Sequence, residues 1–271
     1  MNRSVAAFLA AGLLLAAARS SPALADPSDT EPSGRTGDAP LGMTMRVQQE
    51  YLLGGDSATG DYRACFLPPD RFRVEGIKRL KAMQSDVRIS IAGNGRIVRQ
   101  IEKVGDTTTA HVVDLDRIRK ELPWADYSPA KTYDPSVYRD MLKGAKDKKA
   151  LPAEDLDGAP AEGFELALSK GRLSLPFNVP MVFPDPAKVR FWINPKDGIA
   201  RKVELEDAQG RVFLRTRYTD VKTDAQVNPE VFELEFPKDV TPGDLTNIVI
   251  RGVESTRHPP ERPAEPKSPE N

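Results

Sequence analysis

The chain has 271 residues, of which 39% are hydrophobic and 29% are charged, and its formal net charge is −1 at pH 7. This balance argues against a protein that binds nucleic acid, because such proteins carry a clear excess of lysine and arginine on one face. With Cys65 as its only cysteine, the chain cannot form an internal disulfide, and we interpret Cys65 as a small packed residue rather than a nucleophile.

Residues 1–25 have the features of a signal peptide. A short basic start precedes an apolar run of residues that is shorter than the roughly 20 needed to span a bilayer, and Ala23 and Ala25 form a small-x-small cleavage pattern. We therefore expect cleavage after Ala25 and export of the rest. The alternative is an N-terminal membrane anchor. No lipoprotein is expected, because no cysteine follows the cleavage site.

Two further segments are predicted to lie outside the folded domain. Residues 26–40 are rich in proline, glycine and aspartate and are predicted to be a flexible linker. Residues 253–271 are similar in composition and are predicted to be a disordered tail. The domain is therefore predicted to span residues 41–252.

The first part of this domain alternates apolar and polar side chains, as strands with one buried face do. The predicted strands are residues 43–53, 61–67, 71–77 and 86–101, with a turn at 54–60 and a bend at 68–70. Asn94-Gly95 predicts a type I′ hairpin turn, which requires a positive φ at both positions.

Two short helices are predicted in the middle of the chain. The first follows Asp114 or Asp116, either of which suits a helix N-terminus. The second covers residues 134–144, with Asp134 as the N-cap, Pro135 in the first turn and Gly144 just past the end. The basic residues that follow are interpreted as a solvated helix end rather than a binding patch.

The last part of the domain is again rich in predicted strands. Residues 161–170 and 191–218 alternate, and residues 230–240 are predicted to be a strand with Phe232, Leu234 and Phe236 on one face. Residues 173–186 are apolar but contain four prolines, which favours a long loop that covers or binds something.

The fold class predicted from this pattern is mainly β with α (α+β). Period-two alternation leaves one face of a sheet wet, so the other face must be covered. We expect a curved antiparallel sheet that forms an unclosed barrel, with the helices and the apolar loop covering its concave face.

Catalytic chemistry has little support in the sequence. His111 with Asp114 and Asp116 could form a single-metal site, but protein metal sites usually combine several histidines or cysteines at ligand spacing. Ser57 lacks the G-x-S-x-G motif of a nucleophilic serine, and Glu204 and Glu206 are expected on a solvated face. We expect no enzyme activity, no catalytic residue, no metal and no cofactor.

The second half of the chain resembles the periplasmic outer-membrane lipoprotein carrier family (LolA/LolB-like). The residues that carry the resemblance are Trp192, Asp197-Gly198, Gly210, Tyr218, Phe232, Phe236-Pro237 and Val240. In the first half, Pro69, Asp70 and Phe72 match the bend before the third strand, and the turn at Asn94-Gly95 matches the next hairpin. The resemblance covers residues 43–242.

This resemblance implies a periplasmic carrier or binding protein whose open barrel holds acyl chains in an apolar cavity. The implied partners are a lipid or lipoprotein acyl chain and membrane-anchored donor and acceptor proteins, with a monomeric carrier. The residues expected to line the cavity are Tyr51, Tyr62, Phe66, Phe72, Ile89, Ile91, Met141, Phe177, Phe191, Leu205, Leu214, Phe232 and Leu234. The alternative for these side chains is a dry core.

Two departures from the family pattern indicate a divergent member. Residues 26–40 cannot supply the amphipathic helix that usually precedes the first strand, and Pro68 stands where the carriers have an arginine before the bend. An alternative function is a LolA-like sensor domain, which regulates envelope stress signalling through a protein partner. Trp192 falls on the polar side of its strand and has no predicted role.

Overall fold

The computed structural model describes residues 41–53, 56–80, 85–125, 127–168 and 186–257. The predicted signal peptide, the linker and most of the predicted tail lie outside the described residues, as does Phe177 in the apolar loop. Within the described ranges, no helix combines the length and the apolar character that crossing a membrane requires.

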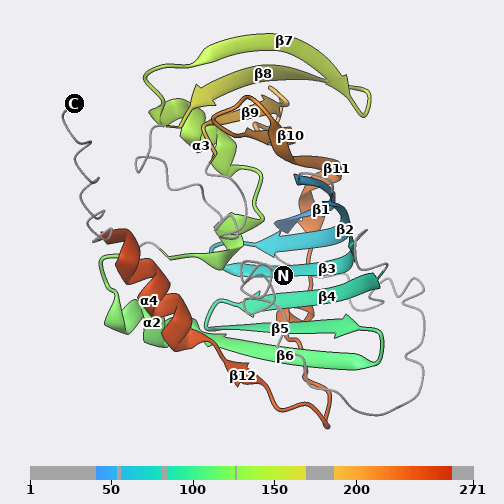
Figure 1. Cartoon of the computed structure of the whole chain (residues 1–271), viewed down its shortest axis with the longest axis vertical. Coiled ribbons are helices and arrows are strands. Elements are labelled where there is room, and N and C mark those ends of the chain that lie inside the picture. Colours follow the sequence, from blue (N-terminus) through green and yellow to red (C-terminus); the bar gives the residue numbers. More distant parts are fainter. Residues whose placement is uncertain (1–40, 54–55, 81–84, 126, 169–185, 258–271) are drawn as a thin grey trace, which may run out of the picture.

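Twelve strands form one open sheet, in the spatial order β12-β6-β5-β4-β3-β2-β1-β11-β10-β9-β8-β7 (Figure 1). The strands are β1 (Leu41–Leu53), β2 (Asp56–Leu67), β3 (Arg71–Leu80), β4 (Ser85–Asn94), β5 (Ile97–Val104), β6 (Thr107–Asp114), β7 (Lys149–Leu156), β8 (Ala159–Ala167), β9 (Lys188–Ile193), β10 (Ala200–Glu206), β11 (Val212–Gln226) and β12 (Gly243–Asp244). Every neighbouring pair is antiparallel except β12 and β6. The predicted fold class, an unclosed and mainly antiparallel sheet, is confirmed.

The β4–β5 hairpin is confirmed, but its predicted turn type is wrong. Gly95 has a φ of +92°, whereas Asn94 is not among the residues with a positive φ. The Asn94 side chain instead accepts hydrogen bonds from the backbone amides of Arg96 and Ile97, each at 3.0 Å. A type I′ turn is therefore excluded, and the asparagine acts through its side chain.

The helices are α2 (Leu115–Glu121), α3 (Val137–Gly144) and α4 (Thr246–Arg257), with 3-10 turns η2 (Pro129–Thr132) and η3 (Pro229–Phe232). Asp114 is the N-cap of α2, because its Oδ1 accepts a hydrogen bond from the backbone amide of Arg117 at 2.9 Å. The predicted N-cap of α3 is wrong, since the helix starts later, after Ser136, and Asp134 instead accepts from the amide of that serine.

Several elements differ from the sequence prediction. The helix α4 was not predicted, and it continues beyond residue 252, where the domain was expected to end. The strand β7 was also not predicted. Residues 233–240, predicted as a strand, belong to no strand, because Asn228 and Pro229 start the 3-10 turn η3 instead.

The helices lie beside one end of the curved sheet (Figure 1). In this view α3 is near β9, and α2 and α4 lie together on the left, while β5 runs away from them to the right. Leu115 and Ile118 of α2, Tyr138 of α3 and Ile250 of α4 join one hydrophobic core with the side chains of one sheet face. That face is the concave one, and the helices of the described residues lie beside one end of its strands (Figure 1).

Candidate functional site

The strand register brings most of the predicted cavity residues to one face of the sheet. Phe66 lies opposite Phe72, Val74 lies opposite Ile91, and Leu205 lies opposite Leu214. The predicted residues that join the concave core are Tyr51, Tyr62, Phe66, Phe72, Ile89, Ile91, Met141, Phe191, Leu205 and Leu214. The period-two pattern therefore identified the correct face across β1–β4 and β9–β11.

The end of this face that the helices cover is packed with side chains. Phe72, Phe191 and Leu205 are fully buried, with 0% of their surface exposed. The Phe72 ring stacks on that of Tyr133 with a centroid distance of 5.7 Å, and the Phe191 ring lies 5.6 Å from that of Tyr138. These side chains form part of the hydrophobic core of the fold.

A second group of apolar residues packs against the same core but keeps part of its surface exposed. From this group we select six residues and name them the apolar band: Tyr51, Ile89, Met141, Leu142, Phe164 and Leu168. It draws on β1, β4, β8, α3 and the residue just after β8. Partly exposed apolar surface gains free energy when it is covered, so the band is the part of the concave face suited to an apolar ligand.

Polar side chains stand on the same face, on the side away from the helices. We name Gln49, Lys78, Gln100 and Glu102 the polar strip; each is partly buried. Glu102 lies directly opposite Ile89, and Gln100 opposite Ile91, so both belong to the concave face. The Lys78 ammonium lies 4.7 Å from the centre of the Tyr51 ring, whose hydroxyl donates to Gln49 at 2.7 Å.

Burial shifts the titration of these groups toward their neutral forms. Desolvation raises the pKa of Glu102, although the hydrogen bond from Gln100 at 2.5 Å acts against the rise. Desolvation also lowers the pKa of Lys78 and raises the pKa of Tyr51 to about 12. Shifted pKa values of this kind are concentrated at functional sites, because such sites often hold titratable groups in partly desolvated positions.

The sequence analysis did not identify the polar strip. In β5, the apolar residues Ile97 and Ile101 point to the outer face, whereas Gln100 and Glu102 point to the concave one. Alternation alone would assign the polar residues to solvent. Only the exact pairing with β4, which no single sequence shows, places Glu102 beside Ile89.

Three predicted cavity residues are not part of this site. Phe232 forms a separate cluster with Leu67 and Val227, so it lies on the outer face of the sheet. Leu234 is buried but does not join the concave core, and Phe177 lies outside the described residues. The prediction for Phe232 and Leu234 depended on a strand that does not form.

The outer face around Trp192 is more buried than predicted. Glu204 and Glu206 were expected on a solvated face, but only 7% and 3% of their surface is exposed. Glu204 pairs with Arg215 at 2.9 Å, and Glu206 pairs with Arg190 at 2.6 Å. These carboxylates are therefore parts of a buried ionic network.

Trp192 itself packs inside the β7–β9 region. It is 5% exposed, clusters with Leu156 and Ala161, and donates a hydrogen bond from Nε1 to the Pro152 carbonyl at 3.2 Å. The Lys202 ammonium lies 3.9 Å from the centre of its ring. The role of Trp192 is thus to join β7 to the rest of the sheet.

The residues considered for metal binding and nucleophilic catalysis have other surroundings. Asp114 caps α2, and Asp116 pairs with Arg96 at 2.9 Å. Within the described part of the chain, no group of three or more His, Cys, Asp or Glu side chains is arranged to hold a metal ion. Ser57 lies within β2, opposite Leu52, and not in a loop as predicted.

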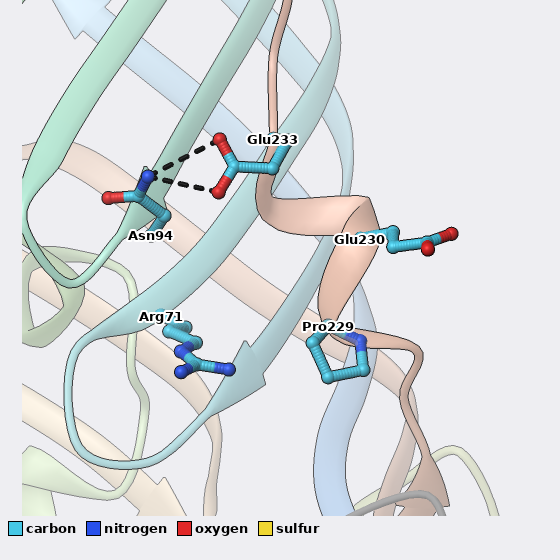
Figure 2. Close-up of a pocket in the computed structure, with 5 residues that line it drawn as sticks. All are labelled: Arg71, Asn94, Pro229, Glu230 and Glu233. Carbon is cyan, nitrogen blue, oxygen red and sulfur yellow. Dashed lines mark hydrogen bonds between the residues drawn. The ribbon is translucent and has the colours of Figure 1, made fainter.

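A pocket of about 250 Å³ lies on the outer face next to η3 (Figure 2). It is lined by Arg71, Asn94, Pro229, Glu230 and Glu233. Asn94 donates to both Glu233 oxygens, at 3.0 and 3.3 Å, so the amide and the carboxylate satisfy each other. We regard this pocket as the place where η3 docks rather than as a ligand site.

No family model and no curated protein matches the chain. Solved structures do match it. LprF from Mycobacterium bovis has a TM-score of 0.45 at 11% identity, over 70% of this chain and 90% of that chain. A putative outer membrane lipoprotein-sorting protein domain from Vibrio parahaemolyticus has a TM-score of 0.30 at 9% identity, over 71% and 89%.

A third match is the MucA/MucB complex of Pseudomonas aeruginosa, with a TM-score of 0.34 at 11% identity, over 72% of this chain and 56% of that one. The likeness is one of fold. It is distant. What the site binds has to be inferred from the residues of this chain.

Proposed function

We propose that this protein is an exported binding or carrier protein for acyl chains of lipids or lipoproteins, which it holds on its concave face. The observation that carries the proposal is the apolar band: residues from separate strands and a helix converge on one core and keep part of their apolar surface exposed. Each methylene of an acyl chain that leaves water gains about 0.8 kcal/mol, so a chain laid along the band would be bound.

Export follows from the predicted cleavage after Ala25, and the periplasm is the compartment that the family resemblance implies. An acyl chain cannot cross an aqueous compartment unprotected, because its transfer to water costs free energy in proportion to its length. A carrier would therefore receive the chain from a membrane-anchored donor and release it to an acceptor. One copy of the protein is sufficient to bind and transfer an acyl chain, so we propose that the carrier is a monomer.

The direct test is to purify the protein from the periplasm, extract it with organic solvent and analyse the extract by mass spectrometry. We expect a lipid or an acylated peptide in near-stoichiometric amount. We also expect the delipidated protein to take up a fluorescent fatty-acid probe. A clean extract together with no probe uptake would refute the proposal.

A pair of variants locates the binding face. Ile89 and Ile101 are both partly buried isoleucines, but Ile89 is on the concave face, opposite Glu102, whereas Ile101 is on the outer face, opposite Ser90. Ile89→Asp should abolish probe uptake, because it places a charge in the apolar band. Ile101→Asp should leave uptake unchanged.

The sensor alternative predicts a different result. If the protein carries no lipid but stays bound to a membrane-anchored regulator during purification, this alternative is favoured.

A further inference from the structure

The polar strip borders the apolar band directly, and this proximity raises the question of what the strip does. Tyr51 of the band contacts Lys78, and Ile89 of the band lies opposite Glu102. An apolar ligand alone would leave these charged groups in a less polar environment than they have without it. Burying charges without partners is costly, so a bare acyl chain is a poor match for this half of the face.

The charges of the strip have bonding capacity that the protein does not use. Among the ion pairs of the described residues, Lys78 takes part in none, and its ammonium lies over the Tyr51 ring. Glu102 accepts one hydrogen bond, from Gln100, and has an oxygen to spare. His111, opposite Gln100 on β6, has a buried Nδ1 with no hydrogen-bond partner.

The outer face of the same strands is organised differently. There Arg46 pairs with Asp61 at 2.5 Å, and Arg73 pairs with Glu75 at 2.5 Å. The first pair joins the neighbouring strands β1 and β2, and the second joins residues two apart in β3, so opposite charges on this sheet meet where their side chains lie side by side. On the concave face, Lys78 and Glu102 influence each other's titration but form no ion pair.

The separation of Lys78 and Glu102 sets the size of the group that would fit between them. Lys78 lies opposite Val87 on β4, and Val87 lies opposite Val104 on β5, two residues beyond Glu102. Two strand spacings and two residues along the strand put the Cα atoms of Lys78 and Glu102 roughly 12 Å apart. The strand β4 therefore lies between the two residues, and no ion pair joins them among the described residues.

We propose that the polar strip binds the zwitterionic head group of a lipid, with the anionic phosphate at Lys78 and the cationic amine at Glu102. This inference rests on the proposed function, since the acyl chain of the same lipid would lie on the apolar band. An anionic head group would leave Glu102 opposed by a like charge, and a cationic head group would do the same to Lys78. Only a group with both signs satisfies both residues.

The surroundings of the two charges fit this assignment. Desolvation disfavours the charged form of each residue, and the arrival of an opposite charge restores it. The hydrogen bond from the Tyr51 hydroxyl to Gln49 fixes the orientation of the Tyr51 ring beside Lys78. The ring would therefore form one side of the head-group site. Gln100 orients the Glu102 carboxylate in the same way.

The test compares three single-chain lipids of equal acyl length for binding to the purified protein by calorimetry. These are lysophosphatidylethanolamine, which is zwitterionic, lysophosphatidic acid, which is anionic, and a neutral monoacylglycerol. We expect the zwitterion to bind about tenfold more tightly than either of the others, which corresponds to one charge-assisted hydrogen bond that the others lack. All three are used below their critical micelle concentrations.

Variants of the polar strip should remove the preference for the zwitterionic lipid without weakening the binding of the acyl chain. Lys78→Met and Glu102→Gln should each bring the zwitterion to the affinity of the monoacylglycerol, whose own binding should not change. Lys78→Arg should retain the preference. Lys103→Met, on the outer face of β5 next to Glu102, is the matched control and should behave as the unchanged protein.

The outcomes separate the two proposals. Equal binding of the three lipids, or tightest binding of the monoacylglycerol, would overturn the head-group site and leave the acyl-binding function intact. A preference that survives both Lys78→Met and Glu102→Gln would also overturn the site. If none of the three lipids binds, the acyl-binding function fails and the head-group site fails with it.

Discussion

Replacing Phe191 by alanine tests whether the helix-covered end of the concave face is a packed core or a ligand cavity. Phe191 is 0% exposed, and its ring lies 5.6 Å from that of Tyr138 and 6.1 Å from that of Phe164. If the end is a packed core, the change removes a buried ring and leaves a void that its neighbours fill only in part.

The expected cost is set by the burial of this ring. Phe→Ala changes at fully buried sites lower the free energy of unfolding by about 3–5 kcal/mol. Because Phe191 has no exposed surface and two aromatic neighbours, we expect a value in the upper half of this range. A typical domain has a total stability of about 5–15 kcal/mol, so the variant should still fold, with a much lower denaturation midpoint.

Urea denaturation followed by tryptophan fluorescence measures this change, since Trp192 is buried next to Phe191 in β9. Phe191→Leu keeps most of the volume and should cost only about 1–1.5 kcal/mol. Ile89→Ala is the comparison for a ligand-facing position: Ile89 is partly exposed, so this change should cost about 1–2 kcal/mol and should weaken uptake of a fatty-acid probe.

The reasoning would be refuted if Phe191→Ala cost less than about 1 kcal/mol and weakened probe uptake more than Ile89→Ala does. In that case the Phe191 ring would face a ligand, and the covered end would be a cavity closed by the helices.

Three other changes test separate parts of the structure by the same denaturation experiment. Gly93→Ala would place a Cβ 2.4 Å from the buried Phe72 ring and should cost about 1–3 kcal/mol; an unchanged midpoint would contradict this packing. Asp114→Ala removes the side-chain bond to the Arg117 amide at the start of α2 and should cost about 1 kcal/mol, whereas no loss would mean that α2 needs no cap. Burial raises the pKa of Glu102 above its ordinary value of 4.5, so its charged form destabilises the fold. Glu102→Gln should therefore stabilise the protein at pH 7, the gain should vanish below about pH 4.5 where both states are protonated, and a loss of stability at pH 7 would contradict the sign of the shift.

The architecture was predictable from the sequence because most strands bury one face only. In β4, Val87, Ile89 and Ile91 alternate with polar residues, and the pairing places all three on the concave face. The N-cap of α2 was predictable for a local reason as well, since Asp114 needs only its own backbone and that of Arg117.

The elements that the sequence did not reveal depend on contacts from distant parts of the chain. The strand β7 has only one buried residue, Leu156, and its alternation is weak because it is an edge strand. The pattern around Phe232 favours a strand, yet no partner strand is available there, and Asn228 caps a 3-10 turn instead. Local alternation cannot show whether a partner exists.

The same limit explains why the polar strip was missed. Lys78 and Glu102 come from β3 and β5, and only the sheet register brings their side chains to one face. Sequence reasoning assigns polar residues to solvent by default, and this default fails on the concave face of this sheet, where Lys78 and Glu102 are partly buried. Buried exceptions to a regular pattern are the positions at which function is most readily found.

The distribution of unpaired charge distinguishes a ligand site from an ordinary core. A face that served only for packing would gain stability if Lys78 and Glu102 were replaced by apolar residues, because neither has an ion-pair partner among the described residues. The buried charges of the outer face, such as Glu204 and Glu206, are all paired. Glu204 and Glu206 are thus paired with arginines, whereas Glu102, beside the apolar band, is partly buried and accepts a hydrogen bond from Gln100 but forms no ion pair among the described residues. This difference is expected if the partner of Lys78 and Glu102 is a ligand rather than another residue of the protein.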